Sequence, residues 1–336
     1  INSTSGIGPF RKAIWIDKDA FDFSSIKYDF DKILRADSNA RVVIRFHLDV
    51  PQWWDERFPE ECQQMPDGSL VRQSFHSPKW RKQAGDVLRE CIQWLQDSPY
   101  AGHLVGIHVA GGFTEEWFYH FKDHFYDKNP LRTTAFRNWL KNRYSNNQAH
   151  LQRAWKNNSV SFEAAKPADI SGKIRNERWR DPNKEQHIID TFRFHAVTMA
   201  DNIAWFCKIV KEASDGDLLT GAFYGYHYFV TDPRRGHGAL SKLLDCPDLD
   251  YISSPNVYNR VMGEDWPPMA AVQSAQLHDK LWLAENDTRT SLTTLLKERA
   301  PEICPPGQYE SSVWLGPPDV ESCTALLWKN SARMLA

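Results

Sequence analysis

The sequence predicts an α/β fold in which a parallel sheet is covered by helices. Apolar, β-branched runs alternate with amphipathic helical patterns through all 336 residues, which is typical of strands joined by covering helices. Polar and aromatic residues also recur where these runs end. No solenoid repeat, low-complexity segment or linker interrupts the alternation. We therefore expect a single domain over residues 1–336, either complete or the core of a longer protein.

Six segments have the composition of buried strands. Two of them end at turn residues: Pro51 closes the second, and Gly111-Gly112 closes the third. Since the carboxyl ends of parallel strands lie at one edge of a sheet, residues that follow the strands are expected to meet there. The predicted strands are 9–16, 40–50, 104–109, 218–229, 249–259 and 280–287.

Helical periodicity fills the intervals between these strands. Most of the helices have an apolar stripe, and Pro130 suits the first turn of the one that it begins. Residues 145–185 are polar and irregular apart from a short helical piece, so we expect an active-site excursion or a surface insertion there. The predicted helices span about 24–34, 79–96, 130–144, 186–213, 237–245, 268–278 and 319–336.

Charge and cysteine patterns argue against several partners. Basic and acidic residues number 41 and 43, so no basic excess indicates nucleic acid. No apolar run approaches the roughly 18 residues of a membrane span, and the start does not resemble a signal peptide. The six cysteines lack CxxC or Cys/His spacing, so we expect buried thiols, with no metal and no cofactor. A soluble protein, cytoplasmic or secreted, fits these patterns, and homo-oligomerisation is left open.

Carboxylates follow two well-separated predicted strands. Glu115 and Glu116 come after the third strand between Phe113 and Trp117, and Glu285 ends the sixth. Glycoside hydrolysis requires such a pair, one acid to protonate the leaving oxygen and one carboxylate to attack the anomeric carbon or activate water. Each glutamate alone is better explained as an ion-pair partner. Together with the aromatic strand ends, the pair favours catalysis on a carbohydrate.

The order of these motifs resembles glycoside hydrolase family 42, the β-galactosidases, within the clan of retaining (β/α)8 glycosidases. ARVVIRFHLDVPQWWDERFPEECQQMPDGS resembles the family's third strand with its Pro-Trp segment, GIHVAGGFTEEWF its fourth strand, and LWLAEND its seventh. The resemblance covers residues 35–160 well and 186–290 loosely. It implies a TIM barrel that is incomplete in this chain, with strands two to seven recognisable and the first and eighth missing.

The resemblance also assigns roles to residues. Glu116, the acid followed directly by an aromatic, becomes the acid/base; Glu285 becomes the nucleophile, which Tyr258 would hydrogen-bond. The family has Asn where Glu115 stands, which implies an altered contact to the sugar 2-hydroxyl and a substrate that differs from galactose. The zinc-binding cysteine cluster of some members is absent. The remaining substrate-binding candidates are Arg45, Trp53, Trp54, Tyr224 and Asn286.

Other functions stay open at this point. A β-glycanase of the same clan would share the catalytic pair but act on another sugar. A non-catalytic carbohydrate-binding barrel would use the aromatic residues for stacking and the glutamates for hydrogen bonds. A dinucleotide-binding fold is disfavoured because no GxGxxG follows the first predicted strand, and a zinc hydrolase because no HExxH is present.

Overall fold

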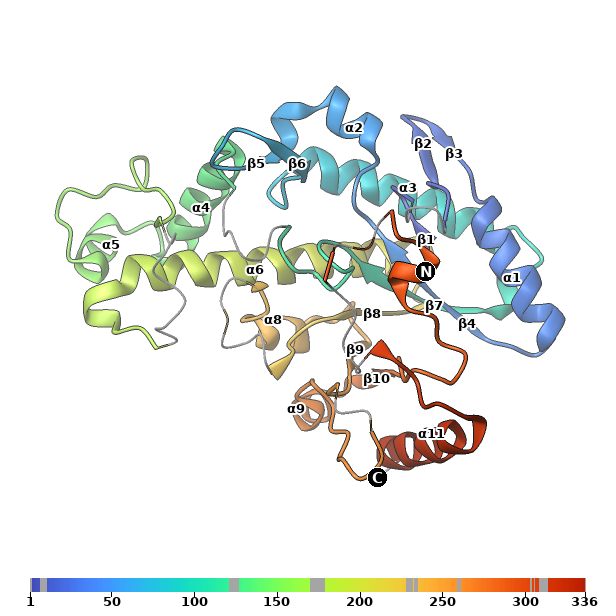
Figure 1. The fold of residues 1–336 in the computed structure, drawn as a ribbon. Helices are drawn as coiled ribbons and strands as arrows, with labels where there is room; N and C mark the ends of the chain where they lie inside the picture. The colour runs from blue at the N-terminus through green and yellow to red at the C-terminus, as the bar shows by residue number, and fades with distance from the viewer. Residues whose placement is uncertain are drawn as a thin grey trace.

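The structure is a computed structural model, and it describes residues 2–6, 11–120, 127–169, 179–227, 232, 235–258, 261–302, 304, 306–307 and 314–335. Its centre is a six-stranded sheet in which every neighbouring pair is parallel. The strands follow one another in chain order across the sheet (Figure 1). They are β1 (Asn2–Ser3), β4 (Val42–His47), β7 (Leu104–Ala110), β8 (Leu219–Phe223), β9 (Tyr251–Pro255) and β10 (Leu281–Glu285). The predicted parallel sheet is confirmed.

The first predicted strand, 9–16, was placed wrongly in the sequence. The edge position beside β4 belongs to β1, in which Asn2 pairs with Phe46 and Ser3 with His47. Residues 9 and 10 lie outside the described residues, and Trp15–Asp17 (β2) instead forms an antiparallel hairpin with Ala20–Phe21 (β3). The Asp17 carboxylate accepts a hydrogen bond from the Lys18 N–H at 2.7 Å, which favours this tight turn over a continued strand. Of the fourth predicted strand, residues 228–229 also fall outside the described residues.

Helices cover one face of the sheet and form the main core with it. They include α1 (Ser24–Ala36), α3 (Pro78–Gln96), α6 (Pro182–Ala213), α8 (Leu240–Leu244) and α9 (Val272–Leu277). Alternate strand residues such as Ile44, Phe46, Ile107 and Val109 point into this core because side chains alternate between the faces of a strand. The helices α3 and α6 pack closely where Gly85 meets Ile209; a Cβ on this glycine would lie 2.5 Å from the isoleucine.

The opposite face of the sheet holds polar and aromatic side chains. The strand register aligns Arg45 with His108, His108 with Gly221, and Gly221 with Tyr251, so these residues form one row across four strands. Gly221 is required in this row because a Cβ there would lie 2.3 Å from the Tyr251 ring. The partial barrel thus encloses a polar interior, and the candidate site lies at its carboxyl end.

The barrel is open on the side of β10. In the part of the chain that the structure describes, β10 pairs only with β9 and β1 only with β4. Leu281 and Leu283, which alternate with Trp282, are 61% and 43% exposed. After β10 come a short helix, α10 (Leu296–Arg299), and a final helix, α11 (Val320–Leu335). The incomplete barrel that the motifs predicted is therefore confirmed.

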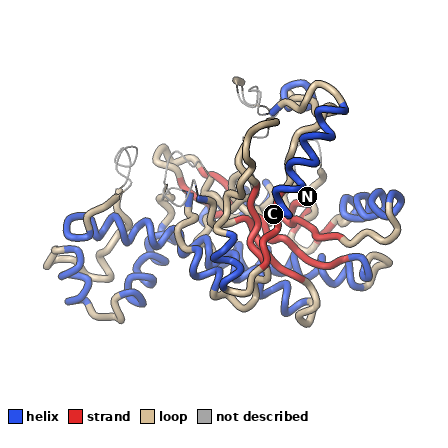
Figure 2. The backbone as a smooth tube through the Cα atoms, turned by 90° about the horizontal axis from the view of Figure 1, so that it is seen from below, coloured by secondary structure: helices blue, strands red, loops and turns tan. Residues whose placement is uncertain are grey.

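The segment 145–185 builds a small satellite core away from the sheet. Its helix α5 (Gln148–Trp155) packs with α4 (Pro130–Arg143) and the first half of α6, which extends beyond the sheet in both views (Figures 1 and 2). Phe136 and Phe194 are at the centre of this core. The carboxylate of Asp190, fully buried, accepts hydrogen bonds from Arg143, Tyr144 and Trp155. Residues 170–178 of the segment lie outside the described residues.

Several short elements were not predicted. The Trp53-Trp54 segment forms a helix, α2 (Gln52–Arg57), which is followed by a 3-10 turn, η1 (Pro59–Glu61). The turn at Asp67-Gly68 joins an antiparallel hairpin of β5 (Cys62–Gln64) and β6 (Leu70–Gln73), and a second 3-10 turn, η2 (Ala101–His103), precedes β7. Among the residues described, no helix has both the length and the apolar character that crossing a membrane requires. Within the same residues no group of three or more potential metal ligands occurs, and no disulfide joins any of the six cysteines.

Candidate active site

The loop after β7 has a strained backbone that carries both glutamates. Thr114, Glu115 and Trp117 all have positive φ angles, of 58°, 66° and 58°. Such angles are costly for residues other than glycine and cluster at functional sites. Gly112, with φ at 75°, approaches the chain so closely that a Cβ would lie 2.3 Å from the Phe118 carbonyl oxygen. The loop is compact, and it holds Glu115 and Glu116 in fixed positions.

Buried contacts keep this loop in place. Trp117 is fully buried, and its indole N–H donates to the Val109 carbonyl at 3.0 Å. His237 is also buried; its Nδ1 accepts from the Gly225 N–H at 3.2 Å, so its Nε2 carries the proton and donates to the Glu116 carbonyl at 2.9 Å. Burial lowers the pKa of His237 to about 3, which keeps the imidazole neutral in this role.

The Glu116 carboxyl group lies between two hydroxyl groups. The Tyr226 hydroxyl donates to Oε1 at 2.9 Å, and Thr114 Oγ1 lies 2.5 Å from Oε2. The same Oγ1 is 2.7 Å from the Phe113 carbonyl oxygen. A hydroxyl has one hydrogen, so when Thr114 donates to Phe113 the contact with Oε2 requires a proton on Glu116. This geometry suits a carboxyl group that holds a proton.

The electrostatics agree with a protonated Glu116. The pKa of Glu116 is raised to about 7: burial is the main cause and the negative charge of Glu285 adds to it, while the hydrogen bonds from Thr114 and Tyr226 oppose the rise. Glu285 is therefore close enough to Glu116 for their charges to interact. Burial also raises the pKa of Glu285, while the Arg45 guanidinium opposes that rise. The two carboxyl groups thus have different partners: hydroxyls for Glu116 and a cation for Glu285.

Arg45 joins the two ends of the site. Its Nη1 donates to Glu285 Oε1 at 3.0 Å, and its Nε lies 3.4 Å from Glu115 Oε2. The guanidinium also lies over the Phe223 ring, with Cζ 5.0 Å from the ring centroid. One fixed, planar cation therefore connects strands β4, β8 and β10 with the loop after β7. The structure places Arg45 in contact with Glu115 and Glu285, and Glu116 within reach of the Glu285 charge; the catalytic and binding roles of these residues stay predictions.

The buried carboxylate of Asp49 holds the start of the loop in place. Asp49 accepts hydrogen bonds from the Gly112 N–H at 2.9 Å and from the Gln73 amide at 2.7 Å. Its other oxygen lies 3.3 Å from Nε2 of both His47 and His120. Burial alone would raise the pKa of Asp49, but these histidines hold it well below the usual range. An ionised Asp49 therefore fixes the Gly111-Gly112 turn on which the glutamates depend.

Two predicted substrate residues lie elsewhere. Trp54 is fully buried, and its indole donates to Gln83 at 2.6 Å, because α2 turns this ring toward α3. Tyr224 is fully buried on the helix side of the sheet, where its hydroxyl donates to the Gly236 carbonyl at 2.7 Å. In these positions neither ring faces the polar interior of the barrel. We correct both assignments to structural roles.

Three other predicted residues are at least partly exposed. Trp53 is partly buried, with its indole bonded to the Trp15 carbonyl at 3.1 Å and its ring beneath Arg57. Tyr258 is 40% exposed and packs against Trp314, with ring centroids 5.8 Å apart. Asn286 is exposed, and its side-chain oxygen accepts from the Thr288 N–H at 3.2 Å. Their contacts with substrate, and that of Tyr258 with Glu285, stay predictions.

Tyr226 was not among the predicted site residues, and neither were Thr114 and His237, although all three contact Glu116. Simple strand alternation would place Tyr224 and Tyr226 on the same side of the chain. Gly225 has a φ of 78°, which turns the chain so that only Tyr226 reaches the Glu116 carboxyl group. A glycine between two tyrosines inside the predicted strand 218–229 was the signal that could have revealed this change of direction, since β8 ends at Phe223.

The fold and the site together define a class of protein: a TIM-barrel glycosidase-like domain with a pair of glutamates at the carboxyl end of its strands. Residues 17–260 match the sequence model of glycoside hydrolase family 42, described as beta-galactosidase. The chain belongs to this family. No curated protein matches the sequence.

Solved structures share the fold at low sequence identity. The catalytic domain of beta-amylase from Paenibacillus polymyxa aligns with a TM-score of 0.62 and 14% identity, over 82% of this chain and 76% of that one. Beta-galactosidase from the psychrophilic Marinomonas ef1 aligns with a TM-score of 0.58 and 15% identity, over 96% of this chain and 54% of that one. Beta-galactosidase from the haloarchaeon Halorubrum lacusprofundi aligns with a TM-score of 0.56 and 16% identity, over 82% of this chain and 47% of that one. The chain spans about half the length of these beta-galactosidases.

Proposed function

We propose that this protein is a retaining, exo-acting β-glycosidase of β-galactosidase type, with Glu285 as nucleophile and Glu116 as acid/base. The observation that carries the proposal is the division of partners between the two acids. Glu285 is bound to the Arg45 cation at 3.0 Å, whereas Glu116 is held by neutral hydroxyls and has its pKa raised to about 7. In glycosidases, surroundings that push the pKa values of two carboxyl groups apart make one of them the acid and the other the nucleophile.

The first step is formation of a glycosyl-enzyme intermediate. Because Arg45 occupies Glu285 Oε1, the second carboxylate oxygen is the one that attacks the anomeric carbon as the glycosidic bond breaks. Protonated Glu116 gives its proton to the departing oxygen, so the leaving group departs as a neutral alcohol. Loss of that proton leaves Glu116 as a carboxylate, which the Tyr226 and Thr114 hydroxyls stabilise.

The second step returns the enzyme to its starting state. Glu116, now ionised, takes a proton from water, and the water oxygen attacks the anomeric carbon and releases Glu285. The pKa of Glu116 falls in the covalent intermediate because Glu285 has lost the negative charge that raises it. The two attacks on opposite faces of the sugar give a product with retained configuration.

Glu115 gives the site its own character. Family members have Asn at this position, whereas here a carboxylate lies 3.4 Å from Arg45 and competes with Glu285 for that cation. A carboxylate accepts hydrogen bonds but cannot donate them, so its contact with a sugar hydroxyl differs from that of an amide. We therefore expect a selectivity among β-linked sugars that differs from galactose preference.

The test is a panel of aryl β-glycosides, with galactose, glucose, mannose, xylose and fucose as the sugar, assayed on wild type and Glu285→Gln. Turnover of at least one β-glycoside by wild type, its loss in Glu285→Gln, and release of the β-anomer first in a proton NMR time course are expected. Absence of turnover with every glycoside, combined with unchanged sugar affinity in Glu285→Gln, would replace this proposal with a carbohydrate-binding role.

A further inference from the structure

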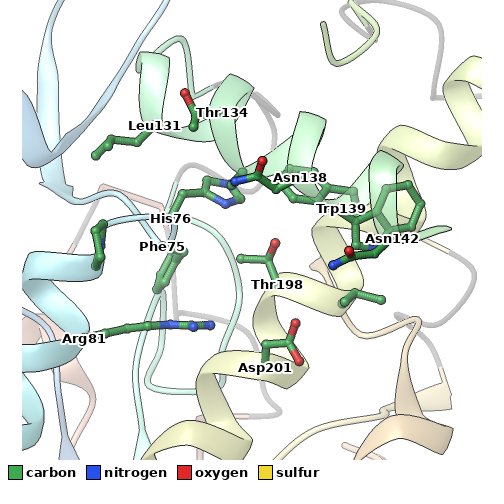
Figure 3. A pocket seen from close by; sticks show the side chains of 14 residues that line it. Phe75, His76, Arg81, Leu131, Thr134, Asn138, Trp139, Asn142, Thr198 and Asp201 are labelled. Atoms are coloured by element: carbon green, nitrogen blue, oxygen red, sulfur yellow. The ribbon is translucent and has the colours of Figure 1, made fainter. Parts of the chain in front are cut away.

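A pocket lies outside the barrel, between three helices. It has a volume of about 400 Å³ and is formed by the first turns of α3, by α4 and by the middle of α6 (Figure 3). This volume falls in the range of small-molecule sites. None of Arg45, Glu115, Glu116, Glu285 and Tyr226 lines it.

An aromatic wall separates the pocket from the catalytic loop. The Phe75 ring lines the pocket, and it packs edge-on against Tyr119 at 5.3 Å and stacks on His120 at 5.2 Å. These two residues directly follow the loop that carries Glu116. The pocket is thus a separate site that shares a wall with the catalytic region.

The interior of the pocket is largely apolar. Leu131, Ala135 and Val197 contribute aliphatic surface, and Phe194 contributes a ring that stacks on His76 at 5.0 Å. Burial lowers the pKa of His76 well below its ordinary value, so this imidazole is neutral. Binding of a ligand with a flat, partly apolar face would remove water from these apolar side chains, which is favourable in free energy.

Polar groups face one another across the mouth of the pocket. On α4, Asn138 and Asn142 are one turn apart, so both side chains lie on the same face of the helix. On α6, Thr198 and Asp201 stand opposite them, as Figure 3 shows. Amides donate and accept hydrogen bonds, and a carboxylate accepts from adjacent hydroxyls.

The charges that line the pocket balance. Arg81 and Asp201 lie at the same end of the pocket in Figure 3, and the two side chains interact electrostatically. Asp201 is also paired with Lys242 at 2.8 Å, and the Arg81 Nε is bonded to Asn202. A strongly charged ligand therefore gains little, whereas a neutral ligand with several hydroxyls meets donors and acceptors along the mouth.

We propose that this pocket is a second, non-catalytic binding site for a neutral sugar ring, which places its apolar face on the Leu131–Phe194 side and its hydroxyls toward Asn138, Asn142 and Asp201. The rigid helices that form the pocket preorganise these groups. The inference does not depend on hydrolysis, since it involves no catalytic residue.

The test uses the full chain carrying Glu285→Gln, so that sugar is not consumed. Lactose and cellobiose are titrated as neutral probes, and glucuronic acid and glucosamine as charged ones, with the side-chain amide signals of Asn138 and Asn142 followed by ¹H–¹⁵N NMR. We expect saturable shifts of these two signals with a neutral disaccharide, and at least tenfold weaker effects with both charged sugars.

Three variants complete the test in the same background. Asn138→Ala/Asn142→Ala removes the amides, so binding to this variant is followed by the backbone amide signals of Leu131 and Phe194, which line the pocket. Thr134→Trp places a large ring at the exposed mouth. Each change is expected to weaken pocket binding about tenfold or more with little change in Tm. Asn183→Ala, an exposed asparagine of α6 outside the pocket, is the matched control and leaves binding unchanged. Neutral-sugar shifts that persist in Thr134→Trp, no shifts at Asn138 and Asn142, or preference for a charged sugar would each overturn the proposal. If the pocket proposal fails in this way, the proposal of catalysis by Glu116 and Glu285 still stands. If instead no glycoside is hydrolysed, the pocket proposal still stands.

Discussion

Arg45 Nη1 lies 3.0 Å from Glu285 Oε1, so a cation from β4 fixes one oxygen of a carboxylate from β10 across the interior of the partial barrel. The two residues are 240 positions apart in the sequence. This ion pair sets the orientation of Glu285 and favours its ionised form. The chemistry proposed for the site depends on it.

Replacing Glu285 with Gln should reduce kcat on an aryl β-glycoside on the order of 10⁴-fold, because the amide cannot form the glycosyl-enzyme intermediate. The variant should stay folded, since Gln keeps the shape of the side chain. Glu302→Gln, an exposed acid remote from β10 in the sequence, is the control and should retain full activity. Equal activity of Glu285→Gln and wild type would remove Glu285 from the mechanism.

Replacing Arg45 with Lys should lower kcat/KM about 100-fold, because a lysine cannot hold Glu115 and Glu285 with one planar group. Arg45 lowers the pKa of Glu285, so a poorer cation lets that pKa rise. The acidic limb of the kcat/KM–pH profile should then move to higher pH. An acidic limb that stays in place would show that Arg45 does not act on the nucleophile.

Replacing Glu115 with Asn should have the opposite effect on the same limb. The Glu115 charge raises the pKa of Glu285, so its removal should move the acidic limb to lower pH. The amide also restores the family's residue, and the ratio of kcat/KM for β-galactoside to that for other β-glycosides should increase. Selectivity is measured on the same aryl glycoside panel, and an unchanged ratio would contradict the role given to Glu115.

Tyr226→Phe tests the acid/base. In wild type, kcat/KM should fall as pH rises through about 7, because Glu116 must be protonated to act as the acid. The Tyr226 hydrogen bond stabilises the carboxylate and lowers the pKa of Glu116. Its removal should move the alkaline limb upward by about one pH unit. Tyr144→Phe, which changes a tyrosine in the satellite core, should leave this limb unchanged.

The strand pattern predicted most of the sheet because buried parallel strands are apolar over several residues. The first strand was misplaced because β1 comprises only Asn2 and Ser3, too short to show any periodicity. Its position depends on pairing with β4, a contact that no local pattern encodes. Long-range pairing of this kind is what the sequence alone leaves undetermined.

The acids of the site were predictable from their place after strands, whereas the direction of the neighbouring rings was not. Trp54 and Tyr224 stand close in sequence to site residues, but helix α2 and the turn at Gly225 direct them into cores. The pocket between α3, α4 and α6 combines residues that are up to 126 positions apart (Phe75 to Asp201). Only the packing of helices brings these side chains together.

Trapping of the glycosyl-enzyme intermediate tests the central claim most directly. Wild type is treated with a 2-deoxy-2-fluoro-β-glycosyl fluoride of whichever sugar it turns over best, digested, and analysed by peptide mass spectrometry. The account predicts one fluorosugar on the peptide that contains Glu285, and none in Glu285→Gln. A label on Glu115 or Glu116 would contradict the assignment of the nucleophile. Product of inverted configuration in the corresponding turnover reaction would contradict the double displacement itself.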